Sequence, residues 1–102
     1  MFSDDPTGLA SLLKDVEEKG VELAHARRAY YRAKNLRALQ LKADGMPVTL
    51  ITETLKGYEE VADARLAMDV AEVMFRTACD AHVDRRQQVR ARNAQMEREW
   101  WS

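Results

Sequence analysis

The sequence predicts an all-α protein, an antiparallel two-helix hairpin with a coiled-coil-like, alanine-rich seam. Fifteen alanines and 32% charged residues in a chain of 102 are typical of long helices, and four glycines with two prolines are too few for a turn-rich β fold. A heptad repeat defines the seam, because large side chains recur every seven residues and small ones follow three residues later. The large side chains are those of Val61, Met68, Phe75, His82, Val89 and Met96. The second series of positions holds alanine three times, at Ala64, Ala71 and Ala78, and then arginine, at Arg85 and Arg92.

The first helix is predicted over about residues 6–43. Asp5 suits the N-cap and Pro6 the first helical position. Apolar residues then recur at helical spacing as far as Leu36. Gly20 is the weak position, since glycine costs about 1 kcal/mol relative to alanine inside a helix.

A turn is predicted at residues 44–48, where the chain reads Asp-Gly-Met-Pro-Val. The second helix is predicted over about residues 49–99. Residues 48–52 are rich in β-branched side chains, but a lone strand would have no partner, so this segment is assigned to the helix. Gly57 leaves two outcomes open: a kink, or a short first segment split from the rest.

Charge supports an antiparallel register in which the numbers of facing residues add to about 92. Residues 25–43 carry six bases and no acid, whereas residues 44–84 carry nine acids and three bases. Folding at the turn places the basic block beside Glu53, Glu59, Glu60 and Asp63, and Asp4 and Asp5 beside Arg85 and Arg86. In this register Leu9, near the start of the first helix, lies opposite the point at which the small ladder positions change from alanine to arginine. The second helix is therefore expected to extend beyond the first from about residue 85.

The second helix carries more apolar surface than one seam needs. The second line holds Ala62, Leu66, Val70, Val73 and Ala81, widened by Leu55 and Met74. The interpretation we favour is self-association into a dimeric four-helix arrangement. Residues 48–56 folding back over the line, and docking of a different protein, are the alternatives.

The sequence offers no convincing catalytic or metal site, so we expect neither an enzyme nor a cofactor. Cys79 and His82 share a helix face, but a metal needs further ligands and a cysteine nucleophile an orienting partner. A buried structural His82 is the favoured interpretation. No apolar run approaches the roughly 18 residues of a membrane span. With a net charge of −1 and no basic start typical of a signal peptide, the chain is expected in the cytoplasm without membrane partners.

The basic C-terminal arm, from residue 85 onward, is expected to bind another protein, because Val89 and Met96 continue the apolar ladder between its arginines. The sequence therefore favours a non-enzymatic oligomeric protein that acts by protein–protein interaction. The alternative is a nucleic-acid-associated accessory protein that uses this arm. The predicted partner-binding residues are Leu66, Val70, Val73, Arg85, Val89, Arg92, Met96, Trp100 and Trp101.

Three helical segments, Leu23–Lys34, Val61–Leu66 and Arg92–Met96, resemble small phage- or prophage-encoded helical-hairpin proteins. The resemblance implies an accessory or host-targeting protein in the host cell cytoplasm, such as an inhibitor of a host defence complex, and carries no residue-level site. The length also resembles secreted helical hairpins with a Trp-x-Gly turn, but Asp44–Pro47 stands here instead, which argues against secretion.

Overall fold

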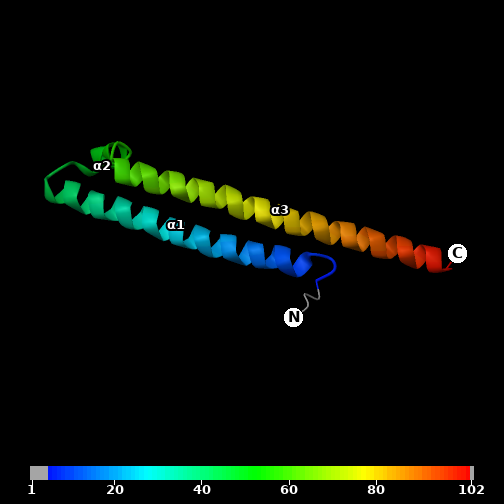
Figure 1. The fold of residues 1–102 in the computed structure, drawn as a ribbon. Helices are drawn as coiled ribbons and strands as arrows, with labels where there is room; N and C mark the ends of the chain where they lie inside the picture. The colour runs from blue at the N-terminus through cyan, green and yellow to red at the C-terminus, as the bar shows by residue number, and fades with distance from the viewer. Residues whose placement is uncertain (1–4, 102) are drawn as a thin grey trace. The chain divides into compact units, whose positions relative to one another are not determined.

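The computed structural model describes residues 5–101, which form three α-helices (Figure 1). Helix α1 spans Leu9–Ala43, α2 spans Val48–Leu55 and α3 spans Glu59–Trp101. Helix accounts for 89% of the described residues, and no strand occurs among them. The all-α prediction is therefore confirmed, including the helical assignment of the β-branched segment after Pro47.

The described chain divides into two compact units. The terminal unit contains residues 5–20 and 74–101, and the central unit contains residues 21–73. Each unit has its own contacts between a stretch of α1 and a stretch of α3. These contacts position the candidate sites of each unit.

The start of α1 corrects one prediction: the helix begins at Leu9 rather than near Pro6. Gly8 has φ +75°, a left-handed conformation that interrupts any helix beginning at Pro6. Asp5 still caps the helix, although it lies four residues before Leu9. Its carboxylate accepts hydrogen bonds from the main-chain N–H groups of Ala10 (3.1 Å) and Ser11 (2.9 Å). These groups lie in the first turn and have no partner within the helix.

The end of α1 is a Schellman motif at the predicted turn. The N–H of Gly45 donates to the carbonyl oxygen of Lys42 (3.1 Å), and the N–H of Met46 donates to that of Leu41 (3.0 Å). Gly45 has φ +87°, which the motif requires at that position. Met46 also packs against the cluster of Leu41, Ile51 and Leu55, and a hydrophobic contact of this kind often accompanies the motif.

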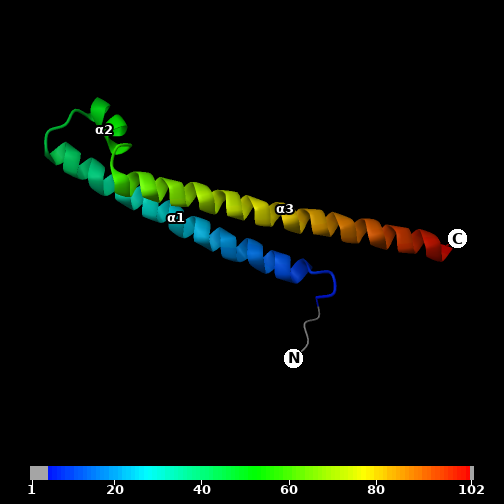
Figure 2. The same cartoon turned by 45° about the horizontal axis from the view of Figure 1, so that its top comes forward.

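Helix α2 corrects the prediction of one continuous helix over residues 49–99. The chain leaves helical geometry around Gly57, whose N–H donates to Thr54 O (3.1 Å) in a tight turn, and α3 begins at Glu59. Figures 1 and 2 show α2 as a separate short helix beside the end of α1 and the start of α3. Its buried side chains Ile51 and Leu55 form the core of the central unit with Leu41. Because glycine is a poor helix former, a break at Gly57 loses little helix stability, and burial of Ile51 and Leu55 stabilises the broken arrangement.

The helix pairs within each unit run in opposite directions. In the terminal unit, Arg85 contacts Thr7, and Phe75 lies beside Gly20. The numbers of these pairs add to 92 and 95, which agrees with the register predicted from charge. In the central unit, Arg65 contacts Tyr30 and Arg37 contacts Glu60, so the order is again reversed.

The heptad ladder marks the least exposed side of α3. Val61 and Ala78 are 4% and 5% exposed, and every ladder position from Val61 to Val89 is buried or half-buried. The next two ladder positions, Arg92 and Met96, are exposed. His82 is half-buried rather than buried, which corrects that detail of the prediction.

Candidate protein-interaction sites

An apolar stripe on α3 of the central unit is the first candidate site. Leu66, Val70 and Val73 are 63%, 53% and 59% exposed. Their spacing of four and three residues puts them on one helix face, and the heptad count puts that face opposite buried Val61. Because Leu66 and its neighbours are so exposed, α2 does not cover the stripe. The alternative in which residues 48–56 fold back over it is therefore wrong in that respect, although the helix does break near Gly57 as that alternative required.

A polar pair lies directly beside the stripe. Arg65 Nε lies 3.5 Å from Asp69 Oδ1, four residues along α3. A second nitrogen of Arg65, Nη1, donates a 3.4 Å hydrogen bond to the hydroxyl of Tyr30. This hydrogen bond, with the carboxylate of Asp69, raises the pKa of Arg65. The apolar stripe is thus flanked by an ion pair, an arrangement typical of interface rims.

The second candidate site is a groove in the terminal unit, where four predicted partner-binding residues meet. The cavity has a volume of about 200 Å³. Its walls are Pro6, Thr7, Arg85, Gln88, Val89, Arg92, Asn93 and Met96. Arg85 forms its inner end, with Nε donating a 2.7 Å hydrogen bond to the carbonyl oxygen of Thr7. The overhang therefore begins later than the predicted residue 85, because α3 is covered by Pro6 and Thr7 at that point.

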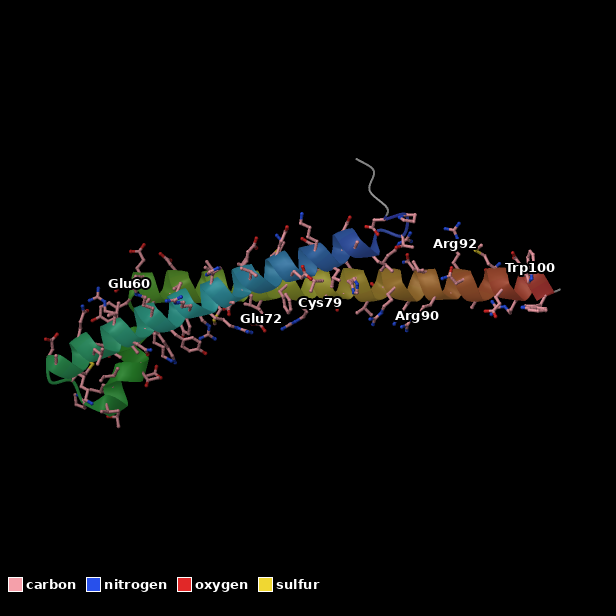
Figure 3. The ribbon with its side chains drawn as sticks, turned by 90° about the horizontal axis from the view of Figure 1, so that it is seen from below. Glu60, Glu72, Cys79, Arg90, Arg92 and Trp100 are labelled. Carbon is pink, nitrogen blue, oxygen red and sulfur yellow. The ribbon has the colours of Figure 1, made fainter. Side chains whose placement is uncertain are left out.

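The end of α3 is exposed, including the residues that line the far part of the groove. Every residue from Arg90 to Trp101 is exposed, and Trp100 and Trp101 are 82% and 80% exposed. Arg90 and Arg92 leave the helix on opposite sides (Figure 3). Arg92 therefore belongs to the groove, whereas Arg90 and both tryptophans line neither candidate site.

The predicted charge pairs are found in part. Arg37 of α1 donates to the carboxylate of Glu60 on α3, which lowers the pKa of Glu60, and its guanidinium stacks 4.3 Å from the Tyr58 ring centre. Glu53 pairs with Lys56 at 3.2 Å rather than with α1.

The predicted pairing of Asp5 with Arg85 is wrong, because each has a different partner. Asp5 binds main-chain N–H groups, and Arg85 binds a main-chain carbonyl oxygen. Asp4, assigned to the same pairing, lies outside the described residues.

Residues 5–101 contain no group of three or more histidine, cysteine, aspartate or glutamate side chains arranged to hold a metal ion. Cys79 is half-buried and has no disulfide partner. No helix within the described range combines the length and the apolar character that crossing a membrane requires.

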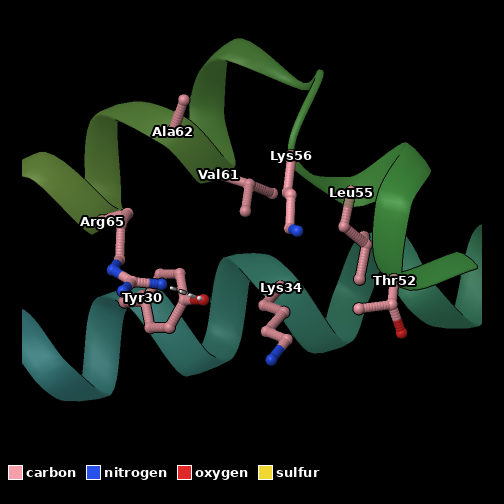
Figure 4. Close-up of a pocket in the computed structure, with 8 residues that line it drawn as sticks. All are labelled: Tyr30, Lys34, Thr52, Leu55, Lys56, Val61, Ala62 and Arg65. Carbon is pink, nitrogen blue, oxygen red and sulfur yellow. Dashed lines mark hydrogen bonds between the residues drawn. The ribbon is translucent and has the colours of Figure 1, made fainter.

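A cavity in the central unit escaped prediction. It lies where α1, α2 and α3 meet and has a volume of about 310 Å³ (Figure 4). The cavity depends on where α2 lies, which the helical spacing of the sequence does not determine. The one sequence feature that pointed to this cavity was Gly57, the position at which the predicted second helix breaks.

Comparisons with protein-family models, with curated proteins and with solved structures found no match for this chain. The resemblance to phage-encoded hairpin proteins therefore stays a prediction.

Proposed function

We propose that this is a non-enzymatic, oligomeric helical protein that acts by protein–protein interaction and that its first partner is a second copy of itself. In this proposal the two units continue as one antiparallel hairpin, and two hairpins pack into a four-helix arrangement. The proposal rests on one observation, the exposure of Leu66, Val70 and Val73 on a side of α3 that residues 5–101 leave uncovered.

The exposed area at the stripe favours burial by a partner. Fully burying a valine or leucine side chain contributes about 1.5–3 kcal/mol, so each half-exposed residue of the stripe offers on the order of 1 kcal/mol. In a symmetric dimer the same patch occurs on both copies, which doubles the contribution of each residue. The flanking ion pair of Arg65 with Asp69 would form part of a polar rim.

The stripe alone is too short for a stable dimer. A specific interface buries about 800 Å² on each partner and involves roughly 20–30 residues a side. The interface must therefore extend along α3, where Met74 is 47% exposed and continues the apolar line. A contact that reaches the arm would also cover Trp100 and Trp101, the most exposed apolar side chains of the described chain.

A matched pair of substitutions tests the stripe. Val70→Asp places a charge in the proposed interface, where it would be buried without a partner, so the dimer should dissociate into a monomer. Val21→Asp is the control, because Val21 is 57% exposed and lies on α1 of the same unit. Sedimentation equilibrium should report a lower mass for the first variant only. Equal masses for both variants would assign the self-contact to another surface.

The basic arm supports one competing function, nucleic-acid binding, because residues 90–101 are exposed and include Arg90, Arg92 and Arg98. Phosphate contacts release counterions, so their affinity falls steeply and log-linearly with salt concentration. An apolar protein contact changes little over the same range. Fluorescence anisotropy with labelled single-stranded DNA from 50 to about 200 mM salt therefore separates the two functions. Tight, salt-sensitive binding that is lost in Arg92→Gln would favour nucleic acid.

A further inference from the structure

The cavity of the central unit is built from all three helices. Its walls are Tyr30, Lys34, Thr52, Leu55, Lys56, Val61, Ala62 and Arg65. Figure 4 shows Tyr30 and Arg65 at one end, Leu55 and Thr52 at the other, and Lys56 extending from above toward α1. The volume of about 310 Å³ lies at the small end of the range for ligand pockets, which begins near 300 Å³.

The buried part of the cavity lining is mainly apolar. Tyr30, Leu55 and Val61 are 8%, 5% and 4% exposed, so their positions are fixed by packing. Ala62 and the methyl group of Thr52 add small apolar surface beside them. A compact apolar body, such as a single aromatic ring, suits a wall of this composition.

The polar part of the cavity is cationic. Lys34, Lys56 and Arg65 line it, and no aspartate or glutamate does. Two of these cations have carboxylate neighbours outside the lining, Lys56 with Glu53 and Arg65 with Asp69. Lys34 differs, because its ammonium lies 5.8 Å from the ring centre of Tyr30 and no ion pair to it is found within the described residues.

We infer that this cavity binds a small organic anion, a compact apolar body that carries one carboxylate or phosphate group. The apolar body would contact Leu55, Val61 and Ala62, and the anionic group would accept charge-assisted hydrogen bonds from Lys34 and Lys56. Arg65 donates a hydrogen bond to Tyr30 and forms one end of the site. Bulk attraction does not explain such binding, since the net charge of the chain is −1. The cavity shares Arg65 with the polar rim of the proposed dimer, but none of Leu66, Val70 and Val73 lines it.

A probe series tests both halves of the ligand. Phenyl phosphate and benzoate combine an apolar ring with an anion, benzyl alcohol has the ring without charge, benzylamine has the opposite charge, and inorganic phosphate has no ring. We expect isothermal titration calorimetry to detect binding of one or both ring-bearing anions, and their relative affinity identifies the preferred anionic group. The neutral, cationic and ring-free probes should bind at least about tenfold more weakly, because each lacks one half of the recognition. Equal binding of all the probes, or of none, would overturn the inference.

Three variants locate the site. Lys34→Gln should lower the affinity for the anion about tenfold, the loss expected for one charge-assisted hydrogen bond. Ala62→Leu should weaken it by filling the cavity without changing charge. Arg32→Gln is the control, since Arg32 is an exposed base on the same helix that does not line the cavity. If Arg32→Gln weakens binding as much as Lys34→Gln, or if Ala62→Leu leaves it unchanged, the anion binds elsewhere.

Discussion

Arg85 ties the start of the described chain to α3: its Nε donates a 2.7 Å hydrogen bond to the main-chain carbonyl oxygen of Thr7. Arg85 occupies a ladder position at which alanine stood one heptad earlier, at Ala78. At this position α1 has ended, and the long side chain of Arg85 reaches the main chain of the segment before Leu9. Arginine at this position therefore continues the contact rather than ending it.

Removing this bond should reduce stability modestly. Arg85→Met keeps the apolar stem but loses the donor, and we expect a cost of about 0.5–1.5 kcal/mol, the usual net value of one hydrogen bond. Urea unfolding measures it. Arg86→Met is the matched control, because Arg86 is the adjacent exposed arginine. Similar costs at both positions would show that the bond to Thr7 contributes nothing.

Overpacking tests the alanine seam in the terminal unit. Ala78 is 5% exposed, so Ala78→Leu forces extra volume into the contact and should destabilise by about 1–3 kcal/mol. Ala91→Leu adds the same atoms at an exposed position and should be nearly neutral. Both are measured by chemical denaturation followed by circular dichroism. Identical effects would mean that Ala78 does not face a partner helix.

The cap at Asp5 predicts a dependence of stability on pH. The N–H of Ser11, and then that of Ala10, bind the carboxylate and lower the pKa of Asp5 in the folded state. A lowered folded-state pKa gives stability that is present above the unfolded-state pKa, about 4, and that is lost as the pH falls through the lower folded-state value. Asp5→Asn resembles the protonated acid, so it should melt below the unmutated protein at neutral pH. The two melting temperatures should converge in acid, and a difference that stays constant with pH would rule out titration of Asp5 as the cause.

Deleting residues 90–102 should change the melting temperature only slightly, because every described residue of that segment is exposed. Binding of a protein partner should be lost, since exposed aromatic side chains such as Trp100 and Trp101 are typical interface anchors. The truncated chain is followed by thermal circular dichroism and by its mass in solution. An unfolded truncation would show that the arm is packed in an oligomer core, and normal partner binding would assign that role to the Leu66 stripe.

The sequence predicted what depends on periodicity and turn chemistry. The buried side of α3 follows from the heptad positions, and the end of α1 follows from Gly45 at a left-handed position. Gly20 was identified only as a weak helix position, but a Cβ there would lie 3.2 Å from the ring of Phe75. Only the tertiary contact explains why glycine occurs at that residue.

Other features depended on whether local helix preference or the burial of side chains against another helix contributes more to the free energy. Gly57 permitted either a kink or a break, and the burial of Ile51 and Leu55 against Leu41 decided for a break. The cavity beside Tyr30 follows from that break, so helical spacing alone could not predict it. At the start of α1, the left-handed conformation of Gly8 moves the first helical residue to Leu9. Asp5 still caps the helix, because its carboxylate accepts a hydrogen bond from the N–H of Ser11, six residues later.

The mass of the unmutated protein in solution tests the central claim most directly. Size-exclusion chromatography with multi-angle light scattering, run at tens of micromolar, should give twice the chain mass of 11.7 kDa if the stripe of Leu66, Val70 and Val73 joins two copies. A mass of 11.7 kDa across that concentration range would contradict self-association. The exposed stripe would then have to serve a different protein.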